Sequence, residues 1–414
     1  MCSIGDDDFE EHGDAMIPQK PLESIIDEQL CKRCNQEMCV LKLSHKKDPE
    51  CKNCFLTYVR HKFKAALGST KMVKRDSTVL LVADNRPESV VMLDMIKYCL
   101  EQNIHQRLHV RIVGVLFINE NFLRDGNEES ELDFIRDIIT RFDYLSMPMY
   151  YTDIGSSSDA VNILEMDHSQ PINESSQLSV KKKLSCLESL TSQQEFIHNL
   201  RITTMKTTAK QLNAQYVFTP DISLDLAKTL LTNISLGRGA SVGLDVAFCD
   251  NRHEPTFRII RPMRDLTTEE VHHYLNLNNL TAGINQKFGE DKAPGMSIQN
   301  LTGQFVNDLQ TKFCGTVSTV FKTGERLTGK TKDQKEVCRV CKSSLDYENS
   351  ETLFAIEYSR LVSEYANQHN SDPEFIEEKA REAVIGNENS IRQKLCHSCR
   401  NMPIESIHII LRNQ

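Results

Sequence analysis

The sequence predicts an α/β protein built on a parallel sheet, with a small cysteine-rich module near each end of the chain. Short apolar runs alternate with helical patterns from residue 79 to residue 276, and this order builds a parallel sheet with right-handed crossovers. Eight of the 14 cysteines fall into four Cys-x-x-Cys pairs, two before residue 55 and two after residue 337. The length of 414 residues suggests two or three domains, or one large domain with small appendages.

Composition and charge exclude several classes of protein. Hydrophobic residues make up 39% of the chain and charged residues 26%, which supports a folded core and excludes a wholly disordered chain. No run approaches the roughly 18 apolar residues of a transmembrane helix. Residues 1–19 lack the apolar core of a secretion signal, so we expect a reducing compartment. The net charge of −9 argues against a protein that coats nucleic acid with its whole surface.

The N-terminal cysteines have the spacing of a four-cysteine zinc site. Two residues separate the cysteines of each pair and 16 separate the pairs, so two knuckles can aim four thiolates at one ion. The expected ligands are Cys31, Cys34, Cys51 and Cys54. Cys39 and His45 lie within the loop and are the alternative ligands. Unrelated reduced cysteines are the structural alternative.

The C-terminal cysteines predict a second closed site of four thiolates. The expected ligands are Cys338, Cys341, Cys396 and Cys399. The two pairs are separated by 54 residues, which hold helical patterns at 352–368 and 373–384. Zinc is the expected metal. A redox pair or an iron–sulfur cluster is the alternative, because four thiolates alone do not separate zinc from iron–sulfur.

The chain divides into four segments. We expect an acidic, disordered tail at residues 1–20, a zinc ribbon and basic helix at 21–70, the α/β domain at 71–330 and the four-cysteine module at 331–414. A polar stretch at about 155–192 predicts a flexible insertion in the α/β domain. Within that domain we expect strands at 79–83, 109–118, 149–151, 216–219 and 256–261, and helices at 89–102, 130–142, 193–213, 223–235 and 267–276.

The first turn at the carboxyl edge of the expected sheet spans residues 83–89, and this edge is where open parallel sheets bind ligands. A phosphate-binding turn needs glycines, because its backbone N–H groups approach the anion with unusual dihedral angles. This turn has no glycine. It carries Asp84 and Glu88, which repel phosphate, and Pro87, which lacks an N–H donor. We therefore predict a structural turn that holds no nucleotide.

Two basic features have both a structural and a functional interpretation. The glycine cluster at 236–243 is a helix C-cap and loop, or a flexible loop that presents Arg238 to a nucleic-acid or partner surface. Residues 55–75 carry six cations and no acid, which makes either a solvated helix face or a surface that contacts phosphates beside the ribbon. The expected RNA-contacting residues are Arg60, Lys62, Lys64, Lys71, Lys74, Arg75 and Arg238.

The ribbon, basic helix, strand and turn together resemble the PP-loop ATPase superfamily of tRNA-thiolating enzymes. In that superfamily the turn reads Ser-Gly-Gly-x-Asp-Ser and grips the ATP pyrophosphate. Here Asp84, Asn85 and Arg86 stand at the Ser-Gly-Gly positions, Glu88 replaces the Asp, and Ser89 matches. The resemblance therefore implies a degenerate PP-loop (adenine-nucleotide alpha-hydrolase-like) fold.

A second thiolase stretch, Thr-Gly-His-Asn-x-Asp-Asp-x-Ala-Glu-Thr, has a partial counterpart. Its matching positions are Thr219, Asp225, Ala227 and Thr229, whereas the Gly-His-Asn portion is lost. The catalytic Cys-x-x-Cys of the thiolases also has no counterpart, because no cysteine occurs between residues 186 and 249. The scaffold is kept and the active site is not.

This pattern is similar to the cytoplasmic tRNA 2-thiolation protein 2 family, whose members are non-identical partners of the catalytic cytoplasmic thiolase. Residues 1–9, 260–264 and 316–324 fit that family. The resemblance implies a non-catalytic subunit of a cytoplasmic heterodimer that 2-thiolates the wobble uridine of tRNAs for Lys, Glu and Gln. The product is 5-methoxycarbonylmethyl-2-thiouridine, and a thiocarboxylated ubiquitin-related modifier delivers the sulfur.

We accordingly expect two zinc ions, tRNA as a partner, no ATP on this chain and no membrane. Two alternatives are open. One is a stand-alone ATP-dependent tRNA thiolase that uses a lone thiol such as Cys314. The other is a zinc-dependent scaffold for protein interactions with no direct role in RNA binding.

Overall fold

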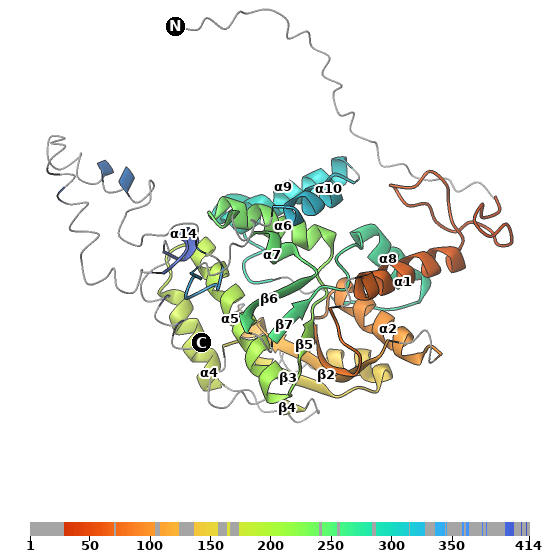
Figure 1. Ribbon diagram of the computed structural model, residues 1–414, viewed down its shortest axis with the longest axis horizontal. Helices are drawn as coiled ribbons and strands as arrows, with labels where there is room; N and C mark the ends of the chain where they lie inside the picture. The colour runs from red at the N-terminus through yellow and green to blue at the C-terminus, as the bar shows by residue number, and fades with distance from the viewer. Residues whose placement is uncertain are drawn as a thin grey trace, which may run out of the picture.

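A seven-stranded, mostly parallel sheet forms the centre of the protein in the computed structural model (Figure 1). The strand order is β4-β3-β2-β1-β5-β7-β6. The structure describes residues 29–69, 72–103, 108–123, 136–155, 164–165, 174–239, 242–254, 257–283, 287–313, 315–327, 336–343 and 394–400, and single positions at 345, 358, 359, 362, 363, 375, 378, 407 and 411.

The central strands are parallel, as the sequence predicts. They are β1 (Ser77–Ala83), β2 (Val110–Asn119), β3 (Met149–Asp153), β5 (Tyr216–Phe218) and β7 (Phe257–Ile260). Helices cover both faces of these strands, so they read as continuous apolar runs. Two antiparallel edge strands, β4 (Leu164–Glu165) and β6 (Cys249–Glu254), were not predicted. The sequence of β6 has one apolar residue, Cys249, and therefore lacks a strand signal.

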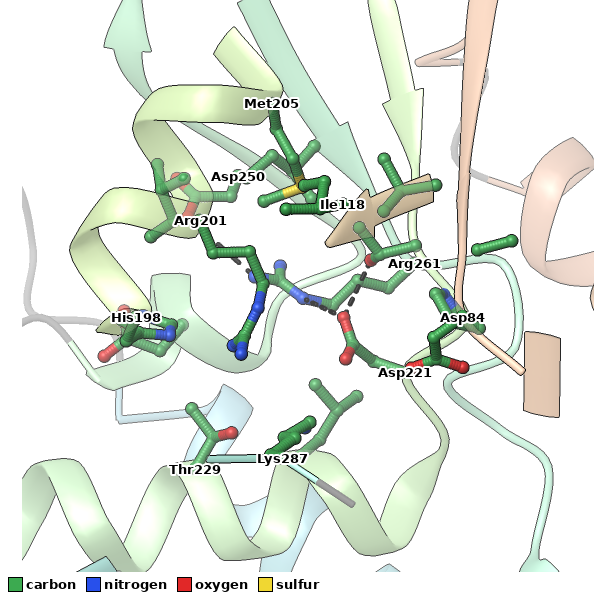
Figure 2. A pocket seen from close by; sticks show the side chains of 18 of the residues that line it. Asp84, Ile118, His198, Arg201, Met205, Asp221, Thr229, Asp250, Arg261 and Lys287 are labelled. Carbon is green, nitrogen blue, oxygen red and sulfur yellow. Dashed lines mark hydrogen bonds and ion pairs between the residues drawn. The ribbon is translucent and has the colours of Figure 1, made fainter. Parts of the chain in front are cut away.

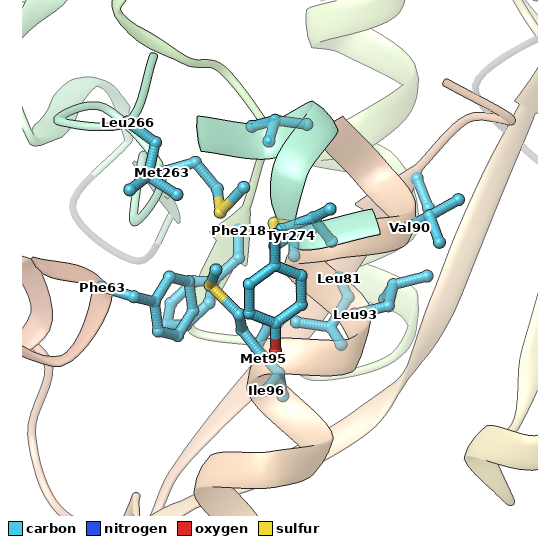
Figure 3. Close-up of a cluster of buried hydrophobic side chains, with 14 of the residues drawn as sticks. Phe63, Leu81, Val90, Leu93, Met95, Ile96, Phe218, Met263, Leu266 and Tyr274 are labelled. Carbon is cyan, nitrogen blue, oxygen red and sulfur yellow. The ribbon is translucent and has the colours of Figure 1, made fainter. Parts of the chain in front are cut away.

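One face of the sheet is covered by three helices that pack on one another: α1 (Lys52–Ser69), α2 (Pro87–Glu101) and α8 (Thr268–Leu277). Their side chains form the largest core cluster with the sheet, and Phe63, Phe218 and Tyr274 lie close together in it (Figure 3). Helix α8 begins with a capping box, because the Thr267 side chain accepts from the Glu270 N–H and the Glu270 side chain accepts from the Thr267 N–H. This face thereby fixes the ribbon and basic helix against the sheet.

The opposite face is covered by α5 (Leu190–Gln211), where Met205 and Ala209 pack on Leu80 and Val217 of the strands. A third group of helices packs beside the sheet edge (Figure 1). It contains α6 (Ser223–Ser235), α7 (Val242–Val246), α9 (Ile298–Lys312) and α10 (Thr316–Glu325). Short 3-10 turns occur at η1 (Asn121–Leu123), η2 (Asp143–Leu145) and η4 (Pro294–Met296).

The expected flexible insertion at 155–192 contains an ordered helix, α4 (Glu174–Ser185), so that expectation is wrong for its second half. Val180 and Leu184 are buried against Phe196 and Leu200 of α5. The same cluster contains three cysteines of the C-terminal quartet, so the C-terminal module, with α14 (His397–Arg400), packs on the central domain. None of the described helices is long and apolar enough to cross a membrane.

Some expected features lie outside the described residues. They are the acidic tail at 1–20, the first part of the helix at 130–142 and most of the helical patterns at 352–368 and 373–384. Residues 136–142 of the expected helix are helical.

Candidate metal centres and sheet-edge cavity

The N-terminal quartet converges as its spacing predicts. All four sulfur atoms lie within 4.8 Å of one another, and the sulfurs of Cys34 and Cys51 are 3.8 Å apart. Tetrahedral zinc with bonds of about 2.3 Å to sulfur places its thiolates about 3.8 Å apart, so the quartet fits such an ion. The alternative ligands are engaged elsewhere. The Cys39 thiol donates to the Pro49 carbonyl, and the His45 Nε2 atom lies 3.8 Å from a Glu270 oxygen.

The C-terminal quartet converges as well, although 54 residues separate its two pairs. Its sulfur atoms also lie within 4.8 Å of one another, with Cys341 and Cys396 at 3.6 Å. Cys338 and Cys399 are fully buried. Four converging thiols fill all four coordination positions of a tetrahedral ion and leave none open for water. Both quartets therefore suit a structural ion rather than one that activates water.

The turn after β1 is closed by its own carboxylate. One oxygen of Asp84 accepts from the Arg86 backbone N–H at 3.0 Å and from the Ser89 hydroxyl at 2.7 Å. The other oxygen accepts from the Arg86 guanidinium at 2.6 Å. In return, the Ser89 oxygen accepts from the Asp84 N–H at 3.0 Å. The Arg86 N–H, the Arg86 guanidinium and the Ser89 hydroxyl are thus already bound to an anion of the chain.

The electrostatics of the turn stabilise that arrangement. Burial opposes the charge of Asp84, but the Arg86 guanidinium and the hydrogen bonds from Ser89 and Arg86 outweigh it and lower the pKa of Asp84. Asp84 is therefore ionised at neutral pH. On the other side of the turn, Asn85 is buried and its side-chain amide N–H donates to Asp137, while its backbone carbonyl accepts from the Gly283 N–H at 2.8 Å. The Asn85 side chain fills the space in which Gly283 would need a Cβ.

A cavity of about 200 Å³ opens at the carboxyl edge of the sheet beside this turn (Figure 2). Its walls combine apolar side chains such as Ile118 and Met205 with charged residues that follow the strands. Most of the charged residues are paired with one another, and Lys287 also lines the cavity. Arg201 forms two hydrogen bonds of 2.7 Å with Glu120, and Arg261 lies 3.6 Å from Asp221.

A third set of charges completes the cavity wall: Arg252 contacts both Asp245 and Asp250 at 2.6 Å. The sequence analysis missed these residues. The signal was available, because Glu120 and Asp221 lie two residues after predicted strands and Arg261 is the last residue of another, at the edge where ligands bind.

The basic helix presents fewer cations to solvent than its sequence suggests. The Lys62 ammonium forms an ion pair of 2.8 Å with Glu270, whose side chain is fully buried. The Arg60 guanidinium stacks 3.8 Å from the centre of the Tyr98 ring and donates to the Tyr274 hydroxyl at 3.4 Å. These residues join α1 to α2 and α8, so the structural interpretation explains their charges.

The other predicted RNA-contacting residues are exposed, buried or outside the described part of the chain. Lys74 and Arg75 are exposed, and Arg75 lines a hollow of about 230 Å³ together with Lys64. Lys71 lies outside the described residues. Arg238 is 7% exposed, forms an ion pair with Glu195 and donates to Asn233 at 3.0 Å. The expectation that a loop presents Arg238 at the surface is therefore wrong.

The glycine cluster that contains Arg238 begins at the end of a helix, as its structural interpretation predicts. Gly237 adopts a φ of 81° after α6, and the Arg238 N–H donates to the Asn233 carbonyl at 2.8 Å. This left-handed conformation favours glycine. The turn directs Arg238 inward, toward the buried carboxylate of Glu195.

Comparisons with known proteins agree with this architecture. Similarity to solved structures includes a U34-tRNA thiolase, NcsA, from Methanococcus maripaludis, solved with its [4Fe-4S] cluster. That match has a TM-score of 0.53 at 13% identity and covers 75% of this chain and 90% of NcsA. It shows that the chain shares the fold of NcsA, with a mostly parallel sheet.

Similarity in sequence is more extensive. A protein named cytoplasmic tRNA 2-thiolation protein 2 from Anopheles gambiae is 40% identical over 97% of this chain and 99% of its own length. The protein of that name from Aedes aegypti is 39% identical over 98% and 99%, and that from Drosophila melanogaster is 36% identical over 98% of each chain. A family model described as cytoplasmic tRNA 2-thiolation protein 2 matches residues 297–401. The chain therefore belongs to the cytoplasmic tRNA 2-thiolation protein 2 family.

Proposed function

We propose that this chain is the non-catalytic subunit of a heterodimeric tRNA sulfurtransferase in the cytoplasm. The catalytic partner is a PP-loop tRNA thiolase, and the complex 2-thiolates the wobble uridine of tRNAs for Lys, Glu and Gln. The sulfur comes from a thiocarboxylated ubiquitin-related modifier. Family membership and the thiolase fold support a role in tRNA thiolation, and the relatives carry the word cytoplasmic in their names.

The observation that carries the non-catalytic role is the carboxylate of Asp84 within the turn after β1. A PP-loop turn binds pyrophosphate through donors that are free to face it. Here the Arg86 N–H, the Arg86 guanidinium and the Ser89 hydroxyl all bind Asp84. Phosphate would have to displace an ionised carboxylate and would meet its negative charge. ATP activation of the uridine therefore falls to the partner.

The contribution of this chain is to bind and position tRNA and to shape the complex. The exposed cations Lys74 and Arg75, with Lys64 at the same hollow, are the residues that can contact RNA phosphates. We assign zinc to both cysteine quartets. The N-terminal ion would hold the ribbon whose Ser44 binds Glu269 of α8 at 2.6 Å, and the C-terminal ion would close the module that packs on α5.

A reconstitution experiment tests this function. The purified chain, a catalytic PP-loop thiolase and their mixture are each incubated with tRNA, ATP and a sulfide source, and 2-thiouridine is measured by mass spectrometry. We expect no thiolation by the purified chain alone. We expect thiolation by the thiolase alone, and more of it by the mixture. Thiolation by the isolated chain would instead support the stand-alone enzyme, whose suggested thiol Cys314 lies outside the described residues.

The scaffold alternative makes a different prediction. If the chain only binds proteins, ultraviolet crosslinking of tRNA to the assembled complex gives no adducts on residues 55–75. Adducts at Lys64, Lys74 or Arg75 support direct RNA binding by this chain.

A further inference from the structure

Arg252 lies between the sheet-edge cavity and the C-terminal cysteine quartet. It belongs to the edge strand β6, lines the cavity and has a side chain that is only 10% exposed. One end of its guanidinium faces the carboxylates of Asp245 and Asp250, and the other end faces the C-terminal module. A residue in this position can transmit the state of one site to the other.

The guanidinium is held rigidly on the sheet side. Its Nε atom donates to one oxygen of Asp250 at 2.9 Å, and its Nη2 atom donates to the other oxygen at 2.6 Å. The same Nη2 atom lies 2.6 Å from Asp245. An arginine bound in two directions by carboxylates keeps a fixed orientation, because its donors form a planar fork.

The remaining nitrogen reaches the metal-binding knuckle. The Nη1 atom of Arg252 donates to the Ser343 hydroxyl at 3.2 Å. Ser343 is 2% exposed, and its carbonyl accepts from the N–H of Cys338 at 2.7 Å. Ser343 thus binds the sheet through its side chain and a cysteine ligand through its backbone.

We propose that Arg252 is a positioning residue for the C-terminal metal site, and that through it metal loading fixes the wall of the sheet-edge cavity. With metal bound, the knuckle at 338–343 keeps Ser343 in place for Arg252, and Arg252 keeps Asp245 and Asp250 in the wall. When the metal leaves, the knuckle loses its closure, Arg252 loses one of its three partners and the β6 edge becomes mobile. The inference concerns the metal site and the cavity, and it holds whether or not the complex thiolates tRNA.

Two variants separate this positioning role from a general loss of folding. Arg252→Lys keeps a cation beside the two carboxylates but cannot fork to Ser343. Ser343→Ala removes only the hydroxyl that accepts from Arg252, and it leaves the Arg252 guanidinium bound to both carboxylates. The control is Arg258→Lys on the neighbouring strand β7, where the guanidinium lies 6.0 Å from the Tyr216 ring.

The measurement uses the full-length chain loaded with zinc and challenged with EDTA and a thiol-alkylating reagent. Metal-bound thiolates resist alkylation, and mass spectrometry of the peptides reports each quartet separately. Loss of a residue that orients metal ligands lowers metal affinity by about 10- to 100-fold, so we expect at least tenfold faster alkylation of the C-terminal quartet in both variants. The N-terminal quartet is the internal reference, and its alkylation rate in both variants should match that in the wild type. In the control variant Arg258→Lys, both quartets should be alkylated at the wild-type rate.

A second measurement tests whether the metal site in turn fixes strand β6 in the cavity wall. Cys396→Ser removes one C-terminal ligand, and we expect faster hydrogen exchange in β6 while exchange in β1 is unchanged. Unchanged alkylation of the C-terminal quartet in both Arg252→Lys and Ser343→Ala would overturn the proposal. Equal acceleration at the two quartets would also overturn it, because it would show general unfolding.

Discussion

Replacing Asp84 by asparagine tests the closed turn directly. Asp84→Asn keeps the shape of the side chain and removes the negative charge that binds Arg86 and Ser89. The carboxylate accepts three hydrogen bonds of 2.6 to 3.0 Å, and hydrogen bonds to charged groups contribute about 1.5–3 kcal/mol each. The side chains of Asp84 and Arg86 are still 28% and 17% exposed. Because solvent screens such a pair, we expect a loss of about 2 kcal/mol in total.

Urea unfolding at pH 7 measures this loss as a lower midpoint at constant slope. Glu101→Gln is the matched control, since Glu101 is 63% exposed and lies 4.0 Å from Lys97; its effect should stay within about 0.5 kcal/mol. If Asp84→Asn changed stability no more than this control, the carboxylate would not hold the turn closed.

The pH dependence of the same difference has a definite sign. The pKa of Asp84 is lowered in the folded chain, so its contribution is complete above the unfolded value near 3.9 and is lost as pH falls through the folded value. The stability difference between wild type and Asp84→Asn should therefore be constant from pH 7 to about pH 5 and shrink below about pH 4. A difference that grew on acidification would refute the ion pair.

Two further changes test the roles of the cations. Lys62→Met leaves the buried carboxylate of Glu270 without its ammonium partner and should destabilise the chain by about 3–5 kcal/mol in urea unfolding; an effect on tRNA binding without loss of stability would contradict the structural role. Reversing charge at Lys74 and Arg75 should weaken tRNA binding by the complex and reduce the salt slope of its affinity by about 1.4–1.8. Charge reversal at the exposed Lys312 is the control, and a slope equal to that control would exclude the two residues from the RNA surface.

The central strands and the cysteine quartets could be predicted because their signals are local. Strand β1 is an apolar run because both its faces are covered, and two-residue spacing marks each cysteine pair. The edge strand β6 gave no such signal, since it pairs with β7 alone and is polar. Helix α4 was missed for a related reason: its few apolar residues, Val180 and Leu184 among them, are spread through a polar stretch.

The partners of single charges could not be predicted from the sequence. Lys62 and Arg238 both look like solvent-facing cations in their own segments. Their carboxylate partners, Glu270 and Glu195, lie 208 and 43 residues away in the chain. The absence of glycine in the turn predicted that phosphate would bind poorly, but not that Asp84 would occupy the turn.

The most direct test is a calorimetric titration of the isolated wild-type chain with ATP and Mg²⁺. An ionised Asp84 that already holds the donors of the turn predicts no saturable heat up to millimolar ATP. Saturable binding with a micromolar Kd that is lost on changing Ser89 or Arg86 would contradict the closed turn, and with it the non-catalytic role of this chain.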